Sequence, residues 1–412
     1  MAQIFPFKAV RPSKEYADII PALPYDVYSR AEAKAEVSKH PHSFLAIDRP
    51  ETNFDDNNFD MYSDEAYEKA ASMLKAWKEE GSFVTDEEPH YYVYELTMCG
   101  RSQTGIVGCA SIDDYLNGVI KKHENTRRDK EEDRVRHVYT CSAQTGPIFL
   151  AYRGDAKLKL AIQEIKKEEA LYDVTGDDGI RHRVWIVTDE ADTELIKKSF
   201  DNMDSIYIAD GHHRCASAVR VGLMKREENP SYDGSEEFNR FMAVLFPDEE
   251  LSILDYNRVV YDLNGLDQMV FMSEISKHFS IGNPSYKAIK PAKKGEISMY
   301  LKGLWYPLTI KDNAVSDDPV EGLDVAILQK YVLDEILDIK DPTTDKRISF
   351  VGGIRGLAEL EKNVAAGAAV AFAMYPTSID ELFRVADAGL LMPPKSTWFE
   401  PKLKSGFFIH EF

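Results

Sequence analysis

The chain has 412 residues, of which 44% are hydrophobic and 29% charged, and its formal net charge is -20 at pH 7. A chain of this length exceeds what one hydrophobic core normally supports, so we expect two packed regions. It contains no run of about 18 apolar residues, which argues against a membrane-spanning helix. The negative charge argues against a nucleic-acid partner.

The cysteines and the first residues predict a cytoplasmic protein. The four cysteines are scattered and form no C-x-x-C pair, which in a chain of this length is typical of reduced thiols. The segment from Met1 to Lys8 lacks a basic stretch followed by an apolar one, so we expect no signal peptide.

Two helices are predicted in the N-terminal part of the chain. The first begins after Ser29, which is expected to form a capping box with Glu32 three residues on. The second spans residues 63–80 and ends before Gly81, with apolar residues at helical spacing.

Strand-like apolar runs dominate the middle of the chain. They span residues 91–96, 105–112, 148–152, 184–187, 206–209, 241–246, 253–260 and 297–310. We expect a hairpin between the first two runs, because Gly100 and Gly105 mark a turn there. The last run is interrupted by Gly303.

The C-terminal part adds an amphipathic helix over 323–337, short buried strands over 348–351 and 369–373, and a helix over 379–388. Together these elements favour an α/β (α+β) fold with mixed sheets and flanking helices. We place a boundary near residue 260. Residues 1–260 then form an α/β region that carries the candidate ligand site, and residues 261–412 form a smaller α/β region whose C-terminal loop is expected to complete that site.

The densest polar chemistry lies where a predicted strand passes into a helix. Asp210 and Gly211 follow the strand at once, and His212, His213 and Arg214 fill the first helical turn. A helix start presents unpaired N–H groups and the positive end of the helix dipole. Cations are unfavourable there unless an anion completes the site, so the pattern predicts an anion site, with phosphate as the usual ligand.

The same residues are compatible with a purely structural role. In that interpretation Asp210 pairs with Arg214 one turn later, and the histidines bond to the backbone. We expect no metal ion to be held by His212 and His213 together, because adjacent residues on a helix point about 100° apart. Helical ligand pairs usually lie four residues apart.

The segment 121–137 is the most charge-dense in the chain. If it is helical, one of its faces is a cationic stripe. The stripe consists of His123, Arg127, Lys130, Arg134 and His137. The alternative is a solvated helix stabilised by ion pairs between side chains four residues apart, which the composition alone favours.

The loop 393–397, with the sequence Pro-Pro-Lys-Ser-Thr, is similar to the end of a P-loop. The glycines of a P-loop are absent and the two prolines lack N–H groups, so this is not a Walker A motif. A proline-framed loop can still present Lys395, Ser396 and Lys402 to an anion. The alternative is a packed tail anchored by Trp398 and Phe399.

These motifs resemble those of the DUF1015 family of bacterial and archaeal proteins, and the resemblance covers nearly the whole chain. It rests on Asp210-Gly211-His212-His213-Arg214, Phe7-Lys8-Ala9-Val10-Arg11-Pro12, Pro24-Tyr25-Asp26, His123-Glu124, Asp133-Arg134 and the segment 392–402.

The Gly-His-His-Arg turn at 211–214 is also similar to the phosphate-binding turn of the ParB and sulfiredoxin-like superfamily. That superfamily includes nucleotide-binding partition proteins, sulfiredoxins and free-serine kinases. Sulfiredoxin chemistry requires a cysteine directly before the His-Arg pair, where this chain has His212. Partition proteins require basic DNA-binding modules, which an acidic chain does not show. The kinase branch passes both tests.

The resemblance therefore implies a nucleotide-dependent phosphotransferase acting on the hydroxyl of a small metabolite, with free serine as a candidate acceptor. It implies ATP or ADP, together with Mg²⁺, as cofactors. Two alternatives stay open. One is a non-catalytic regulator that binds a nucleotide or a phosphometabolite, and the other is a phosphatase acting on a small phosphorylated metabolite.

The resemblance also implies roles for individual residues. Glu124 is expected to act as a general base or to hold Mg²⁺ through water. The catalytic candidates are Glu124, His123, Asp210 and His213. The expected phosphate or nucleotide ligands are Gly211, His212, His213, Arg214, Arg127, Arg134, Lys395, Ser396 and Lys402. Tyr25 and Asp26 are candidates for substrate binding, and no set of protein metal ligands is expected.

Overall fold

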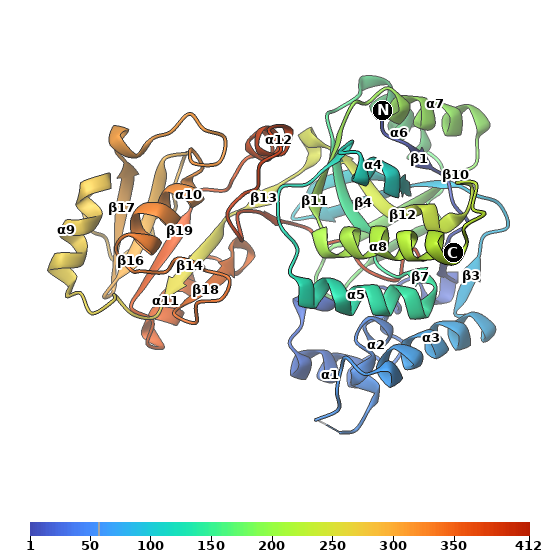
Figure 1. The fold of residues 1–412 in the computed structure, drawn as a ribbon, viewed down its shortest axis with the longest axis horizontal. Helices are drawn as coiled ribbons and strands as arrows, with labels where there is room; N and C mark the ends of the chain where they lie inside the picture. The colour runs from blue at the N-terminus through green and yellow to red at the C-terminus, as the bar shows by residue number, and fades with distance from the viewer. Residues whose placement is uncertain (57) are drawn as a thin grey trace. The chain divides into compact units, whose positions relative to one another are not determined.

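The computed structural model describes residues 1–56 and 58–412, which divide into two compact units (Figure 1). Unit 1 comprises residues 1–251 and 401–412, and unit 2 comprises residues 252–400. The expected boundary near residue 260 therefore falls inside unit 2. Residues 401–412 belong to unit 1, although the sequence pattern had assigned them to the second region.

Unit 1 is a mixed α/β structure. Its helices are α1 (Arg30–Lys39), α2 (Leu45–Asp48), α3 (Asp64–Glu79), α4 (Ile112–Leu116), α5 (Arg128–Cys141), α6 (Ala156–Ile165), α7 (Glu190–Asp201) and α8 (His212–Glu228). Its strands are β1 (Ile4–Phe5), β2 (Val10–Pro12), β3 (Phe83–Thr85), β4 (Tyr91–Met98), β5 (Arg101–Ser111), β6 (Ile120–Lys121), β7 (Ala143–Gln144), β8 (Ile148–Tyr152), β9 (Tyr172–Thr175), β10 (Arg181–Val187), β11 (Ile206–Asp210), β12 (Arg240–Pro247) and β21 (His410–Glu411).

The main sheet of unit 1 has, within the described residues, nine strands in the order β6-β11-β8-β12-β5-β4-β10-β9, with β1 paired to β5. The β11–β6 and β12–β8 pairs are parallel, and the remaining pairs are antiparallel. This arrangement confirms the predicted mixed sheet with flanking helices. Two short pairs, β2–β3 and β7–β21, lie outside the main sheet.

Helix α8 is packed on two sides, which fixes where its first turn points. On one side Cys215, Ala218 and Val219 join the hydrophobic core of the main sheet. On the other side Val221 packs against Val135 of α5, and the two helices run side by side in Figure 1. Burial on both faces holds the start of the helix rigidly at the end of β11.

Unit 2 is built on a six-stranded antiparallel sheet in the order β15-β17-β16-β19-β14-β18. Its strands are β13 (Ile253–Leu254), β14 (Tyr256–Val260), β15 (Phe279–Ile281), β16 (Glu296–Leu301), β17 (Leu304–Ile310), β18 (Ile348–Gly352), β19 (Val370–Met374) and β20 (Trp398–Phe399). Its helices are α9 (Gln268–His278), α10 (Asp324–Leu328), α11 (Leu357–Ala365) and α12 (Ile379–Asp387). The core includes Val259, Trp305 and Leu360.

Several local predictions are confirmed. Ser29 caps α1 through a complete capping box with Glu32, and Ser63 caps α3. The hairpin between β4 and β5 also forms, but its turn lies at Cys99 and Gly100, which both have positive φ. Gly105 is not part of the turn. It lies within β5, where a Cβ would come within 2.9 Å of the Leu245 carbonyl oxygen.

Two predicted helices differ from the expectation. The helix over 323–337 starts as α10 and continues as a π-helix over Gln329–Asp334. The charged segment 121–137 is helical only from Arg128 onward, because Ile120 and Lys121 pair with β11 as an extended strand. The cationic stripe therefore does not form, since His123 and Arg127 precede the helix.

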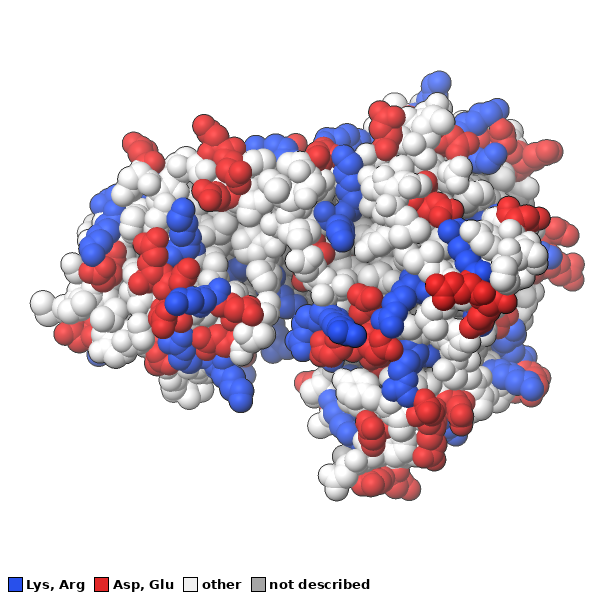
Figure 2. Space-filling view, in the orientation of Figure 1, with Lys and Arg blue, Asp and Glu red and all other residues white. Residues whose placement is uncertain are grey.

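Acidic and basic side chains are interspersed over the face of the molecule shown in Figure 2. Among the residues that the structure describes, no helix has the length and apolar character needed to cross a bilayer.

Candidate functional site

The predicted strand-turn-helix forms at the end of β11. The strand carries a register shift between Ile208 and Asp210, and Gly211 follows with φ 88°, a backbone conformation that favours glycine. No side chain of the described residues caps α8, so its first turn lacks the carboxylate or hydroxyl that usually accepts the opening N–H groups. These N–H groups are suited to binding an anion.

Arg214 lies over this turn. A Cβ placed on Gly211 would lie 3.1 Å from both Nε and Nη2 of Arg214, so the glycine gives the guanidinium room to approach the backbone. Nη1 of Arg214 donates to the carbonyl of Pro147 at 2.5 Å. Among the described residues Arg214 forms no ion pair within 4.0 Å, so the Asp210–Arg214 pair of the purely structural interpretation does not form.

Asp210 instead pairs with Lys402, whose Nζ donates to Oδ2 at 2.8 Å. Its other oxygen accepts the backbone N–H of Gly211 at 2.8 Å. Burial acts to raise the pKa of Asp210, but the nearby charges of Lys402 and Arg214 outweigh it and hold that pKa well below its ordinary value. Asp210 is therefore a stable anion that fixes the turn, and it is a poor proton acceptor at neutral pH.

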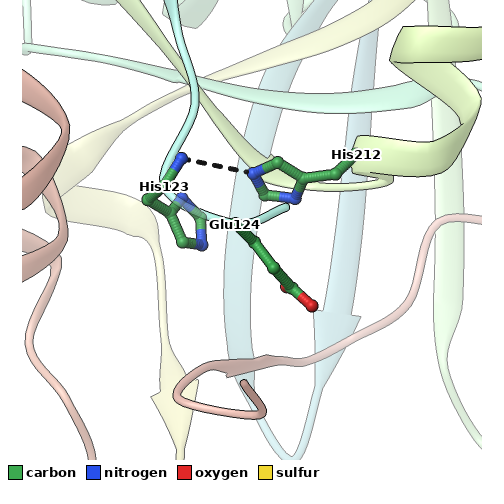
Figure 3. A group of neighbouring side chains, drawn as sticks. All are labelled: His123, Glu124 and His212. Carbon is green, nitrogen blue, oxygen red and sulfur yellow. Dashed lines mark hydrogen bonds between the residues drawn. The ribbon is translucent and has the colours of Figure 1, made fainter. Parts of the chain in front are cut away.

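A second cluster lies beside the first residue of α8. His123, Glu124 and His212 each offer a nitrogen or oxygen ligand atom, and these atoms lie within 4.8 Å of one another. Figure 3 shows the two imidazoles next to each other, with the Glu124 side chain starting close to both rings. The ring centroids are 4.5 Å apart, and the backbone N–H of His123 donates to Nε2 of His212 at 3.5 Å.

Both histidines of this cluster are uncharged at neutral pH. Burial lowers the pKa of His123 to about 4, and only weaker contributions from Ile208 and Asp210 oppose it. Burial and then the neighbouring His123 lower the pKa of His212 well below its ordinary value. A neutral imidazole keeps a lone pair, so each ring can bind a metal ion, but with pKa values this low both rings are weak proton acceptors at neutral pH.

His213 and Arg127 meet through the backbone rather than through their charges. The backbone N–H of Arg127 donates to Nε2 of His213 at 2.9 Å. The Arg127 guanidinium pairs with Asp129 at 2.8 Å, and both side chains are exposed. The contact orients His213 at the start of α8, and the Arg127 side chain is ion-paired outside the cluster of histidines.

Arg134 and Tyr25 line the same small cavity in unit 1 as Arg214. The cavity has a volume of about 20 Å³ and is lined in part by Tyr25, Asp48, Arg134 and Arg214, which leaves room for about one water molecule. The Arg134 guanidinium stacks over the Tyr25 ring at 4.1 Å. It also pairs with Asp133 at 3.0 Å, so its charge is already compensated.

The remaining candidates have different surroundings. Asp26 is exposed beside Tyr25. Lys395 and Ser396 belong to unit 2, where the Ser396 hydroxyl donates to the carbonyl of Pro393 at 2.6 Å. The carbonyl of Lys395 accepts a hydrogen bond from Arg258 at 3.1 Å. Of the three residues expected to form an anion-binding C-terminal loop, only Lys402 is in unit 1.

Comparison with protein families identifies the chain. Residues 4–326 match the model of a family described as "Protein of unknown function (DUF1015)". The chain belongs to the DUF1015 family. No curated protein matches it.

Several solved structures resemble this DUF1015 protein. A free serine kinase in complex with AMP is 13% identical, with a TM-score of 0.35, and the match covers 74% of this chain and 91% of that one. SbnI from Staphylococcus aureus, truncated at its C-terminus, is 11% identical with a TM-score of 0.36, covering 71% and 82%. A conserved hypothetical protein from Pyrococcus furiosus is 14% identical with a TM-score of 0.33, covering 73% and 93%. At these scores the likenesses carry no argument about activity.

The DUF1015 site also uses residues that the sequence analysis missed. Pro147 supplies the carbonyl that holds Arg214, and Thr145 donates to Asp48 at 2.9 Å beside the cavity. At Gly146 a Cβ would lie 2.9 Å from the Ser405 hydroxyl oxygen. The Gly-Pro pair just before a predicted strand was a turn signal that pointed to this segment. The partners themselves lie too far away in sequence to be inferred.

Proposed function

We propose that this protein is a nucleotide-dependent phosphotransferase that phosphorylates the hydroxyl of a small metabolite. The observation that carries the proposal is the uncapped start of α8 behind Gly211, with the Arg214 guanidinium lying over it. The helix N–H groups and the guanidinium together offer several hydrogen-bond donors to a phosphate, although the net charge of the chain is -20.

The phosphate end of the nucleotide binds at residues 211–214 in this proposal. The opening N–H groups of α8 and the positive end of its dipole favour an anion. Arg214 adds a charge that a backbone carbonyl orients without neutralising it. Guanidinium groups stabilise the charge that spreads over the transferred phosphoryl oxygens.

Glu124 is our candidate for the base that takes the proton from the acceptor hydroxyl. Glu124 is half-buried next to the start of α8, and Asp210 is held as an anion by Lys402. In the transfer, the acceptor hydroxyl gives its proton to a base and its oxygen forms a bond to the terminal phosphorus of the nucleotide. The bond from that phosphorus to the departing nucleotide breaks, which leaves a phosphate ester together with ADP if the donor is ATP, or AMP if the donor is ADP.

The acceptor and the cofactors follow from the same proposal. Free serine is the first acceptor to test, because the Gly-His-His-Arg turn is similar to that of the free-serine kinases. ATP and ADP are both candidate donors. Mg²⁺ is usually held by one or two carboxylates together with the phosphates, and Glu124 fits that role. When bound, Mg²⁺ supplies charge neutralisation.

The proposal is tested by nucleotide binding and turnover. The Arg214→Ala variant should bind ATP and ADP about 10- to 100-fold more weakly than the wild type, because it loses a charge-assisted contact to phosphate. Titration calorimetry with Mg²⁺ measures this. Phosphorus NMR after incubation with ATP or ADP, Mg²⁺ and a panel of hydroxy amino acids, serine first, measures turnover.

Arg220→Ala is the matched control. Arg220 lies on the same helix but pairs with Glu132 at 2.7 Å, so its loss should leave nucleotide affinity unchanged. Equal affinity of the Arg214 variant and the wild type contradicts the phosphate site. Binding without phosphoryl transfer to any acceptor contradicts the enzyme and favours a nucleotide-binding regulator. Release of phosphate from a phosphorylated metabolite without nucleotide indicates a phosphatase.

A further inference from the structure

The cluster of His123, Glu124 and His212 has the composition of a metal site. Its three ligand atoms lie within 4.8 Å of one another, and its members come from two places in the chain. His123 and Glu124 follow strand β6, and His212 opens α8. The parallel pairing of β6 with β11 brings the two segments together, so the main sheet itself sets the spacing.

The hydrogen bonding of His123 is unusual for a buried residue. His123 is only 1% exposed. Within the described part of the chain neither of its ring nitrogens has a hydrogen-bond partner. Other buried histidines of unit 1 are held by at least one contact. Nε2 of His137 contacts the Ile47 carbonyl at 3.0 Å, and Nδ1 of His182 contacts the Tyr94 hydroxyl at 2.8 Å.

Unpartnered nitrogens in a buried ring are costly. Each unsatisfied polar group of this kind destabilises the folded protein. A metal ion bound to one nitrogen of His123 removes part of that cost. The backbone of Ile208 lies near the ring without forming a hydrogen bond of ordinary geometry to it. Metal-binding histidines commonly have a backbone carbonyl behind the ring as an outer partner.

We propose that His123, Glu124 and His212 bind a divalent transition-metal ion, with Zn²⁺ as the representative ion. Two imidazole nitrogens and one carboxylate suit Zn²⁺ and its first-row neighbours, whereas Mg²⁺ prefers oxygen ligands. Three protein ligands leave a fourth position of a tetrahedral site open to water or to a ligand. Glu124 is half-buried while both histidines are buried, so the open position faces the Glu124 side.

Metal binding requires a small change at His212. Nε2 of His212 accepts the His123 backbone N–H at 3.5 Å, which is at the outer limit of hydrogen-bond length. Such a weak contact is readily given up when the ring turns toward a metal ion. The two rings already stand nearly perpendicular, at 89°.

This inference holds whether or not phosphoryl transfer occurs, because metal binding is measured without nucleotide. If both hold, Glu124 acts through the metal ion rather than as a proton acceptor. A protein that binds Zn²⁺ but no nucleotide would keep this inference and lose the phosphotransferase. A protein that binds nucleotide and transfers phosphate but does not bind Zn²⁺ would keep the phosphotransferase and lose this inference.

The test uses the full-length chain without a histidine tag. The protein is stripped with a chelator and titrated with Zn²⁺ and, for its visible spectrum, with Co²⁺. We expect about one ion per chain, a Co²⁺ spectrum of tetrahedral type, and a rise of several degrees in the unfolding temperature with Zn²⁺. The variants His123→Gln, His212→Gln and Glu124→Gln should each weaken Zn²⁺ binding by more than about 100-fold, the upper effect of outer-shell changes.

His182→Gln is the matched control. His182 is equally buried and its Nε2 also lacks a partner in the described structure, but it is outside the cluster, so Zn²⁺ affinity should not change. Glu124→Gln keeps the test valid if a buried histidine variant does not fold, because Glu124 is half-buried. Zn²⁺ affinity that is equal in wild type and Glu124→Gln would overturn the proposal, as would Co²⁺ absorption that stays octahedral.

Discussion

The two charged side chains that flank Gly211 are held in different ways. Asp210 is paired with Lys402, so its negative charge is compensated and serves to fix the turn. Arg214 donates to the Pro147 carbonyl, which orients the guanidinium but carries no charge. One side of the turn is therefore neutral and the other is positive, which is the distribution that an anion site requires.

Replacing Lys402 by Met tests the role of this ion pair. We expect the free energy of unfolding to fall by about 1–2 kcal/mol at pH 7, because a half-buried charged hydrogen bond is lost. The pKa of Asp210 is lowered in the folded protein, so the stability that this carboxylate contributes is present above its ordinary pKa of about 4. That contribution is lost as the pH falls through the lowered pKa.

Urea unfolding of wild type and Lys402→Met at a series of pH values from 7 to 3 provides the measurement. The gap between the two proteins should narrow below about pH 4. Lys159→Met is the control, because Lys159 forms an exposed pair with Glu249 and should change stability little. A gap of constant size over this pH range would show that Asp210 is not held ionised by Lys402.

At the scale of single elements, the turn between β11 and α8 depends on Gly211. Its φ is 88° and an added Cβ would lie 3.1 Å from the Arg214 guanidinium. A side chain here both strains the backbone and pushes the guanidinium away from the helix start. The geometry of the anion site is therefore set by the absence of a side chain at one position.

The Gly211→Ala variant should lower the free energy of unfolding by about 1–2 kcal/mol, the cost of a left-handed conformation for a non-glycine residue. It should also weaken ATP binding, because Arg214 is displaced. Gly179→Ala is the control, since Gly179 has φ 74° with nothing within 4 Å of an added Cβ. Chemical unfolding and titration calorimetry measure both effects. If the two variants bind ATP equally well, the turn at 211 does not shape the phosphate site.

The helices and strands around the site could be predicted where residues close together in the sequence specify them. An apolar run, a glycine and the residues of a first helical turn within residues 206–214 were enough to predict β11, the turn and the start of α8. The helix expected over 121–137 starts late, because pairing with β11 holds Ile120 and Lys121 extended. A cross-strand partner of this kind is not visible in local charge spacing.

The contacts that build the site were not predictable in the same way. The His123–His212 contact joins residues 89 positions apart, and the Asp210–Lys402 pair joins residues 192 positions apart. No periodicity specifies such pairs, since they result from the strand order of the main sheet. The resemblance to the DUF1015 family pointed to all four residues but not to which of them touch.

At the scale of the whole molecule, unit 1 is formed from two separate stretches of chain. Residues 401–412 supply Lys402 to the site, the strand β21 that pairs with β7, and the fully buried Phe408. Phe408 packs near Tyr92 and Tyr94 in the main sheet, with ring centroids 5.0 and 6.0 Å apart. The C-terminal stretch is thus part of the core of unit 1.

The variant Phe408→Ala should therefore destabilise unit 1 by about 3–5 kcal/mol and leave unit 2 intact. Hydrogen exchange with mass spectrometry distinguishes the units, because loss of protection is expected over residues 1–251 and not over 252–400. Trp305→Ala is the mirror control, since Trp305 is buried in unit 2. Equal loss of protection in both units after Phe408→Ala would mean that the units unfold as one.

The division of unit 1 has a consequence for its biosynthesis. A ribosome completes residues 1–251 first and must then translate all of residues 252–400 before the segment carrying Lys402 and Phe408 is made. At roughly 5–20 residues per second this delay is on the order of 8–30 s. During that time the apolar surface that Phe408 covers and the Asp210 carboxylate lack their partners, so we expect the nascent first stretch to need protection by a chaperone.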